Sequence, residues 1–328
     1  MKLGVSYFGN RSPKHVARDM EDIAKSNCNF VVHTFSENDL AYYKKAMKEI
    51  VSISHDLGLE VYTDPWSVGN VFGGEAFSDF VAKNPDTWQV LSSKEIIPRA
   101  CLNSEKFRRF MKDWIIAAYE IGSDVIFWDE PHMFLSSKPD EKAVFSCVCE
   151  LCQKKFKGKF GRPMPSGLTP DVHLFIGETI AGFLKDMSLF SKRHKMKNAV
   201  CVYAKEEYEP FWDIIASIKS IDIFGTDPYW RFAKKSLRPY VTYYTKKVLS
   251  VCEKHNKEAQ LWIQAVRIPK GCEREIEEAI DIVSKEGIKN IAAWSYHAGG
   301  LIDTLASKNP QLVWKTLTGA YGRLLAQE

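Results

Sequence analysis

The chain has 328 residues, of which 45% are hydrophobic and 26% are charged, so it is long enough to bury a large core and is not expected to be disordered. Lys and Arg total 45 against 41 Asp and Glu, a formal net charge of +4, and the basic residues are scattered apart from a cluster at residues 152–160. This balance argues against a nucleic-acid partner.

The opening residues, MKLGVSYFG, lack the pattern of a signal peptide, and no run of 18 apolar residues follows anywhere in the chain. We therefore predict no membrane span and no membrane partner. Eight cysteines without an export signal favour thiols or a metal site over disulfides, which predicts a cytoplasmic protein. Whether the chain forms a homo-oligomer is left open.

Short apolar segments rich in β-branched and aromatic residues recur along the chain, and longer segments with helical periodicity follow them. The predicted strands are residues 2–9, 29–35, 59–66, 123–130, 198–204, 221–230, 259–266 and 289–297. Helical periodicity is clearest at residues 13–27, 39–58, 105–122 and 273–287. Eight strands in alternation with helices predict an α/β protein, a single (β/α)8 TIM barrel over residues 1–328.

Two connections are longer than a minimal barrel needs: residues 67–104, after the third predicted strand, and residues 131–168, after the fourth. In this architecture the active site lies at the C-terminal ends of the strands, whatever the chemistry. Polar and aromatic residues gather at or just after these ends. The predicted substrate-binding residues are Tyr7, His33, Asp64, Trp66, His132, Trp230, Gln264, Arg267, Trp294 and His297. Such a set suits a carbohydrate, whose hydroxyls need polar partners and whose C–H faces stack on aromatic rings.

Cleavage of a glycosidic bond commonly needs two carboxyl groups, one that protonates the leaving oxygen and one that acts as nucleophile or base. Glu130, in FWDEPHMF, is the predicted acid, because apolar neighbours at the end of a strand raise the pKa of a carboxyl group. Asp227, in FGTDPYW, is the preferred partner and Asp129 the next. Adjacent strand residues point to opposite faces, so Asp129 and Glu130 are not expected to share one task.

Simpler structural roles remain open for these acids. Asp129 and Glu130 could cap a following helix, and Asp64 and Asp227, each before a proline, could form turns. Glu75, in FGGEAF, could be carried into the site by its loop.

Three cysteines form a C-x-C-x-x-C run in the second long connection: Cys147, Cys149 and Cys152. Three thiols at this spacing indicate structural zinc, which takes four ligands in a tetrahedron. Cys101, in the other long connection, can supply the fourth if the two loops meet. The alternative is a set of unligated thiols.

Together these features resemble the catalytic barrel of glycoside hydrolase family 42. The similarity lies in residues 101–161: a lone cysteine, an acidic pair that closes the fourth strand, the C-x-C-x-x-C run and an aromatic, basic segment that ends in KFG. It implies a clan A glycosidase with zinc on these cysteines and with Glu130 as acid/base, preceded by Asp129 where the family has asparagine. The family's nucleophilic glutamate on strand seven is not matched, because Gln264 stands there.

Other interpretations stay open. The FWDEP run also resembles the strand-four motif of family 31 α-glycosidases, which would make Asp129 the nucleophile and Asp227 the acid. A metal-dependent sugar isomerase or hydrolase could place acidic and histidine ligands at the strand ends. Its candidate ligands are Glu130, Asp227, His33, His132 and His297. A non-catalytic carbohydrate-binding barrel would explain the amide at position 264.

Overall fold

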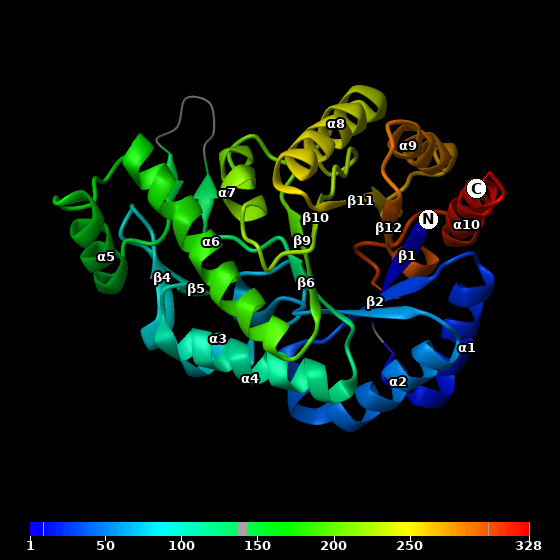
Figure 1. Cartoon of the computed structure of the whole chain (residues 1–328), viewed down its shortest axis with the longest axis horizontal. Coiled ribbons are helices and arrows are strands. Elements are labelled where there is room, and N and C mark those ends of the chain that lie inside the picture. Colours follow the sequence, from blue (N-terminus) through cyan, green and yellow to red (C-terminus); the bar gives the residue numbers. More distant parts are fainter. Residues whose placement is uncertain (9, 137–142, 301, 328) are drawn as a thin grey trace.

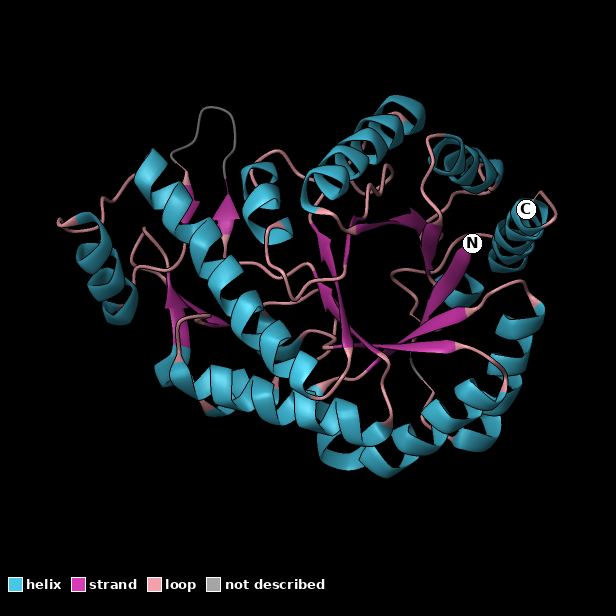
Figure 2. Cartoon of the chain, viewed as in Figure 1, coloured by secondary structure: helices cyan, strands magenta, loops and turns pink. Residues whose placement is uncertain are grey.

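The computed structural model describes residues 1–8, 10–136, 143–300 and 302–327, and it is a closed parallel barrel (Figures 1 and 2). The eight barrel strands are β1 (Lys2–Tyr7), β2 (Phe30–Thr34), β3 (Glu60–Asp64), β6 (Val125–Asp129), β9 (Lys197–Val202), β10 (Ile223–Thr226), β11 (Glu258–Gln264) and β12 (Asn290–Trp294). All eight predicted strands are confirmed, although most are shorter than predicted. Parallel pairing of β1 with β12, from Lys2 opposite Asn290, closes the ring.

Helices alternate with the strands and surround the barrel (Figure 2). They are α1 (Pro13–Lys25), α2 (Lys44–Asp56), α4 (Glu105–Ile121), α6 (Pro170–Arg193), α7 (Trp212–Ala216), α8 (Leu237–His255), α9 (Arg274–Lys285) and α10 (Pro310–Leu325). Local signals set their ends: Ser104 caps α4 by accepting a hydrogen bond from the Phe107 amide at 3.4 Å, and Gly122 ends it in the left-handed conformation. In the described part of the chain, no helix is long and apolar enough to cross a membrane, and a cytoplasmic location stays a prediction.

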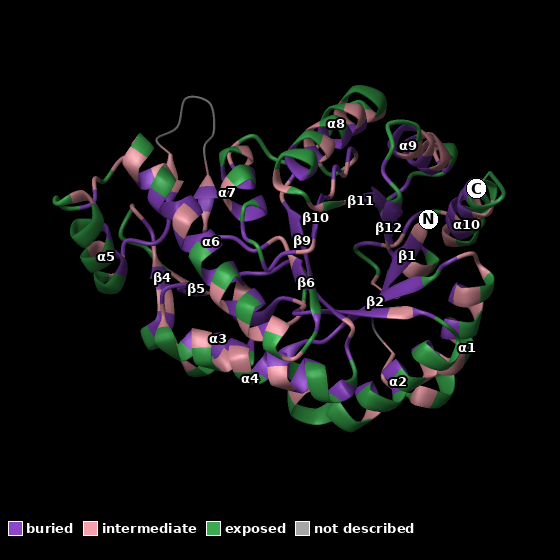
Figure 3. Ribbon diagram, in the orientation of Figure 1, coloured by how far each residue is buried: buried purple, intermediate pink, exposed green. Residues whose placement is uncertain are grey.

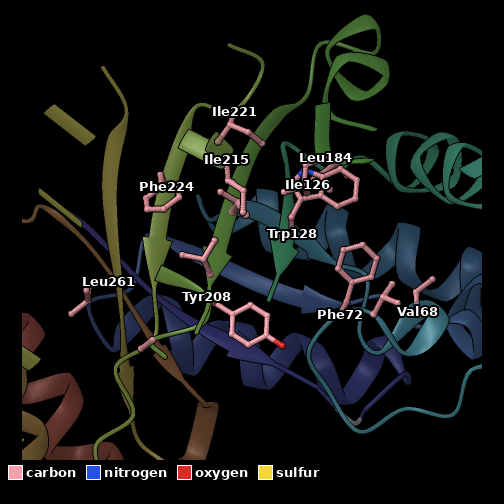
Figure 4. Packing of buried hydrophobic residues seen from close by; sticks show 14 of the residues in the cluster. Val68, Phe72, Ile126, Trp128, Leu184, Tyr208, Ile215, Ile221, Phe224 and Leu261 are labelled. Atoms are coloured by element: carbon pink, nitrogen blue, oxygen red, sulfur yellow. The ribbon is translucent and has the colours of Figure 1, made fainter. Parts of the chain in front are cut away.

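The strands are buried on both faces, which explains their nearly continuous apolar sequences (Figure 3). Their outer face packs against the helices, for example through Ile126 and Trp128 of β6 and Leu184 of α6 (Figure 4). The buried Trp128 indole donates a hydrogen bond to the Asn198 side chain at 3.0 Å. Trp128 therefore belongs to the layer between sheet and helices and points away from the barrel interior.

Aromatic side chains fill the inside of the barrel. Phe30 stacks on Tyr62 with ring centroids 4.8 Å apart, and Phe127 packs on Trp262 at the same separation. The Trp262 indole donates to Gln260 at 3.0 Å, and the Gln260 amide donates to Asn290 at 2.9 Å. These contacts pair the polar side-chain atoms of Trp262 and Gln260, and the interior is a packed core that underlies the C-terminal mouth.

The two predicted loop expansions are present and contact each other. The first contains α3 (Asp79–Lys83), β4 (Trp88–Val90) and β5 (Ile96–Ala100); the second contains β7 (Leu135–Ser136), β8 (Val144–Phe145) and α5 (Glu150–Phe160). A bridge between Leu91 and Ser146 joins the two small hairpins, and the Val148 amide donates to the Val90 carbonyl at 2.8 Å. The loops thus form one lobe beside the barrel (Figure 1).

The barrel sheet tolerates no side chain at Gly225 of β10. A Cβ there would lie 2.4 Å from the backbone oxygen of Gln260 on β11, an atom that cannot move without distorting the sheet. We expect Gly225→Ala to lower the free energy of unfolding by about 1–3 kcal/mol, measured by urea denaturation. Gly182→Ala is the matched control, because a Cβ there meets nothing within 4 Å and alanine favours helix. Equal destabilisation by both substitutions would contradict this explanation.

Candidate active site

A cavity of about 970 Å³ opens at the C-terminal mouth of the barrel. Its carboxyl-bearing lining residues are Asp64, Glu75, Asp129, Glu130, Glu206, Glu207 and Asp227. Its aromatic lining residues are Trp66, Phe127, Tyr203, Tyr229, Phe232, Tyr240, Tyr244, Trp262 and Trp294. The cavity therefore combines the acids and the aromatic rings that the sequence predicts for a carbohydrate site, in the place that the fold predicts.

Glu130 and Asp129 both line this cavity, which corrects the expectation that they point to opposite faces. Asp129 is the last residue of β6, and Glu130 follows it with a φ of 42°, in the left-handed region. The rule of alternating faces applies only within an extended strand, and the turn at Glu130 brings its side chain back to the mouth. Among the residues that the structure describes, the next helix is α5, which begins at Glu150, so the acidic pair caps no described helix.

Glu130 and Asp227 both line the cavity and lie close enough for the charge of Asp227 to act on Glu130. Burial, followed by the charge of Asp227, raises the pKa of Glu130 well above its usual value. Burial and then the charge of Asp129 raise the pKa of Asp227 to about 8. Because the pKa of Asp227 is about 8, the pair holds at least one proton at neutral pH. The Tyr203 hydroxyl lies 3.4 Å from His132 Nδ1, and Tyr203 lines the same cavity.

Asp64 and Asp129 lie on the neighbouring strands β3 and β6. Asp64 is 3% exposed, and its Oδ1 has no hydrogen-bond partner among the described residues. Burial, then the charge of Asp129, raises the pKa of Asp64, and burial, then the charge of Glu130, raises the pKa of Asp129. Carboxyl groups this close cannot all ionise, so part of the cluster stays protonated in the absence of a ligand.

Two glycines allow the loop after β3 to lie close to these acids. A Cβ on Gly73 would lie 2.1 Å from the Asp129 carboxylate, and one on Gly74, whose φ is +113°, would lie 2.5 Å from the Trp66 indole. The Gly73 amide also donates to the Asp129 carbonyl at 3.0 Å. The glycines are thus needed for close approach, and they carry Glu75 to the exposed rim of the cavity.

Aromatic rings also line the cavity, beside the acids. Trp294, at the end of β12, stacks on Tyr229 with centroids 5.6 Å apart and on Phe232 at 6.0 Å, and it meets Trp66 edge-on at 6.4 Å. Trp66 and Trp294 were predicted from the sequence, whereas Tyr229 and Phe232 were not. Tyr229 follows Asp227 by two residues, and this spacing could have indicated it.

Several predicted substrate-binding residues lie outside the cavity, because they point outward to helices. The Tyr7 hydroxyl donates to Asp19 of α1 at 2.6 Å, and His33 Nε2 pairs with the Ser54 hydroxyl of α2 at 2.9 Å. His297 pairs with Asp22 of α1 at 3.2 Å. Burial lowers the pKa of His33 to about 3, so this histidine is a neutral structural group.

Four other predicted substrate-binding residues lie beside the cavity and do not line it: His132, Trp230, Gln264 and Arg267. The Trp230 indole donates to Glu275 at 2.8 Å, and the Arg267 guanidinium lies 4.8 Å from the Phe232 ring centroid, behind the aromatic wall. Gln264 is fully buried: its oxygen accepts from the Arg231 amide at 3.0 Å, and its nitrogen donates to the Val266 carbonyl at 2.9 Å.

The side chain of His132 contacts the backbone of Glu130. Its Nδ1 donates to the Glu130 carbonyl at 2.7 Å, and its Nε2 accepts from Arg99. Burial and the charge of Arg99 lower the pKa of His132 to about 3, so the ring stays neutral. His33, His132 and His297 therefore do not converge with Glu130 and Asp227 on a metal, and the ligand set of the metal-dependent alternative is not assembled.

Sequence reasoning missed the residues that follow β9. Tyr203 and Lys205 line the cavity, and the Lys205 ammonium lies 4.2 Å from the Tyr203 ring centroid. The positive charge of Lys205 opposes the rise in the pKa of both Glu130 and Asp227. Tyr203 and Lys205 could have been found from the sequence, because they lie at the end of a predicted strand.

The four predicted cysteine ligands lie together in the lobe formed by the two expanded loops. The sulfur atoms of Cys101, Cys147, Cys149 and Cys152 are all within 4.8 Å of one another, the one group of three or more potential ligands in the described part of the chain. Cys101 Sγ is 3.9 Å from Cys149 Sγ and 3.5 Å from Cys152 Sγ. A zinc ion with four Zn–S bonds of about 2.3 Å separates its sulfurs by about 3.8 Å, so the cluster fits zinc.

No protein-family model matches the chain, and no curated protein matches its sequence. Solved structures do resemble it. A β-galactosidase from the psychrophilic Marinomonas ef1 aligns over 100% of this chain and 60% of its own, with a TM-score of 0.73 and 12% identity. This chain thus spans less than two thirds of that enzyme.

Two further neighbours extend the comparison. An endo-1,4-β-mannanase from Rhizomucor miehei aligns over 100% of this chain and 95% of its own, with a TM-score of 0.65 and 12% identity. A D-psicose 3-epimerase from Clostridium cellulolyticum H10 aligns over 99% of each chain, with a TM-score of 0.52 and 11% identity. These likenesses show the fold. The neighbours thus include glycosidases and a sugar epimerase on the same barrel.

The raised pKa of Asp227 predicts a pH-dependent stability. A carboxyl group that titrates near 8 when folded, and near about 3.9 when unfolded, binds its proton more tightly in the folded state. The folded state therefore loses stability as pH rises between these values. We expect the stability of Asp227→Asn, relative to wild type, to increase from about pH 5 to about pH 8, by up to about 1.4 kcal/mol per unit in urea denaturation.

Glu209→Gln is the control for this measurement. Burial opposes the shift, but hydrogen bonds from Lys247 and Tyr243 lower the pKa of Glu209, so that carboxylate stays ionised over the same pH range and its removal should give a constant difference. A constant difference for Asp227→Asn as well would show that Asp227 is ionised throughout.

Proposed function

We propose that this protein is a glycoside hydrolase whose general acid/base is Glu130. The observation that carries the proposal is the close pair of Glu130 and Asp227 at the barrel mouth, in a cavity that Trp66 and Trp294 also line. A carboxyl group that is protonated at neutral pH can give its proton to a glycosidic oxygen, and indole rings stack on sugar faces. The β-galactosidase and mannanase among the structural neighbours support a carbohydrate substrate on this fold.

Each member of the site has a task in bond cleavage. Glu130 protonates the departing glycosidic oxygen, and the resulting carboxylate later takes a proton from the water that completes hydrolysis. Asp227 is its partner carboxylate, and the charge of Asp227 helps to hold the proton on Glu130. Asp129 raises the pKa of Asp227 and is the second candidate for the partner carboxylate. Asp64, with its unpartnered Oδ1, bonds a sugar hydroxyl.

Glu130→Gln tests this assignment. An amide of nearly the same shape cannot donate the acidic proton, so turnover of glycosides with poor leaving groups should fall by about 100- to 10,000-fold. Nitrophenyl glycosides with activated leaving groups need less protonation and should be less affected. A panel of such glycosides and oligosaccharides would first identify a substrate.

The control is Glu207→Gln, at the same cavity but in the loop after β9. It should keep most of the turnover. Wild-type turnover by Glu130→Gln on every substrate would exclude Glu130 as the acid.

We further propose that the cysteine cluster holds a structural zinc ion. The sulfur spacing fits a tetrahedral ion, and nearby donors suit thiolates: the Val90 amide lies 3.4 Å from Cys147 Sγ, and the Asn103 amide lies 3.3 Å from Cys152 Sγ. Bound zinc supplies four cross-links and no chemistry at the cavity, and the chain's own contribution is to hold the two expanded loops together.

Cys149→Ser tests the zinc site. We expect the wild-type protein to contain about one zinc ion per chain, and the variant to lose both the metal and thermal stability because a tetrahedral site needs all its thiolates. Metal analysis and the melting temperature measure the two effects. Cys272→Ser, a half-buried thiol outside the cluster, is the control and should change neither. Purified wild-type protein without metal would refute the site.

A further inference from the structure

A second cavity, of about 640 Å³, adjoins the candidate active site. Most of its lining residues follow β1 and β2, and Trp66 and Ala76 come from the loop after β3. Trp66 lines both cavities, and Glu75 of the first cavity is followed in the chain by Ala76 of the second. The loop after β3 therefore forms the boundary between them. We call the second cavity the side cavity, and its volume lies in the range of small-molecule sites.

A row of aromatic rings connects the two cavities. Trp294 of the first cavity lies 5.6 Å from Tyr229 and 6.4 Å from Trp66, measured between ring centroids. Trp66 in turn stacks on Phe8 of the side cavity, with centroids 5.4 Å apart and ring planes 25° apart. Aromatic surface thus continues from the cavity that contains Glu130 into the side cavity.

The backbone holds Trp66 in place at the boundary. The Ser67 amide donates to the Gly73 carbonyl at 2.7 Å, and the Ser67 hydroxyl donates to the Gly74 carbonyl at 2.9 Å. A Cβ on Gly74 would lie 2.5 Å from the indole, so this backbone packs directly against the ring. The ring therefore has little freedom to turn, and both cavities are preformed around it.

An ion pair with little exposure lines the side cavity. The Arg11 guanidinium donates to the two carboxylate oxygens of Asp39 at 2.5 Å and 2.9 Å, and to the carbonyl and hydroxyl oxygens of Thr34 at 2.9 Å. Its Nη1 donates to the Asn10 carbonyl at 3.0 Å. The second hydrogen of Nη1 has no partner among the described residues. The pair thus offers a ligand one fixed donor and no net charge.

Neutral polar side chains accompany this pair. The Ser12 hydroxyl, the Asn38 amide and the Tyr43 hydroxyl belong to residues that line the side cavity, and none of them is hydrogen-bonded to another described residue. Uncharged donors and acceptors beside aromatic rings suit a neutral sugar unit, whose hydroxyls need polar partners and whose C–H faces pack on rings.

We propose that the side cavity is a second sugar-binding subsite, and that the substrate is a neutral oligosaccharide that crosses Trp66. One part of the oligosaccharide lies at Glu130 and another lies against Phe8 and Tyr43. This inference rests on the proposed function for the bond that is cleaved in the first cavity. Binding energy gained in the side cavity, away from that bond, helps to hold the glycosidic oxygen at Glu130.

Tyr43→Ala tests the subsite, and Tyr42→Ala is its matched control. Both tyrosines lie in the helical turn Asp39–Tyr43 and are exposed, by 41% and 79%, but only Tyr43 lines the side cavity. The probes are β-1,4-linked manno-, gluco- and galacto-oligosaccharides of two to six units. Wild-type kcat/KM should rise by at least about 10-fold once the chain reaches the side cavity. Tyr43→Ala should lose most of this rise, and Tyr42→Ala should keep it.

The charge of the ligand is a separate test. Oligogalacturonates of the same lengths carry a carboxylate on each unit, and the acids of the first cavity repel them. They should bind at least about 10-fold more weakly than the neutral series, measured by calorimetry on Glu130→Gln. Tighter binding of the oligogalacturonates would overturn the assignment to a neutral sugar.

Binding without turnover separates this inference from the proposed function. In Glu130→Gln, the longer neutral oligosaccharides should bind at least about 10-fold more tightly than the disaccharides, and added Tyr43→Ala should remove the difference. Equal affinity at every length, or equal losses in Tyr42→Ala and Tyr43→Ala, would overturn the subsite and leave Glu130 as the acid. Length-dependent binding that needs Tyr43, with hydrolysis of no glycoside by wild-type protein, would support the subsite and refute the proposed function. Binding of none of the three neutral series would overturn the subsite.

Discussion

The dry aromatic interior of the barrel is the constraint on which the site depends. Phe127 and Trp262 pack against each other inside the barrel and also form the floor of the cavity. Because they exclude water from below, the carboxyl groups above them are desolvated, and burial is the largest cause of the raised pKa of Asp64, Asp129 and Glu130. A core that stabilises the fold thus also favours the protonated form of these acids.

Protonation alone does not make a carboxyl group an acid catalyst, because the group must also be held in a fixed orientation toward the bond that it protonates. Glu130 is held in a left-handed backbone conformation, and His132 bonds its carbonyl at 2.7 Å from behind. Asp227 and Tyr203 line the cavity beside its carboxyl group. The hydrogen bond from His132 therefore supports the strained turn, as is common where a backbone outlier serves a site.

The cysteine lobe and the cavity share one segment of chain. The loop after β3 contributes Gly73 against the Asp129 carboxylate, and farther along it contributes Arg99, which bonds His132, and then Cys101 of the thiol cluster. Fixing Cys101 thus fixes the strand that braces His132 and, through it, the backbone of Glu130. Zinc at the cluster would act on catalysis only through this positioning.

The sequence by itself determined the strands of the barrel, the two expanded loops and the acids at the ends of β6 and β10, whereas the meeting of Cys101 with the C-x-C-x-x-C run was only a conditional prediction. These follow from hydrophobic patterning and from where parallel strands end. Only the tertiary structure decided which side chains face the cavity. His33 turns to Ser54 of a helix, Tyr229 faces in where Trp230 was expected, and Glu130 joins Asp129 on one face. At the end of a strand the alternation stops, and the direction of a side chain then depends on one backbone torsion and on partners distant in the sequence.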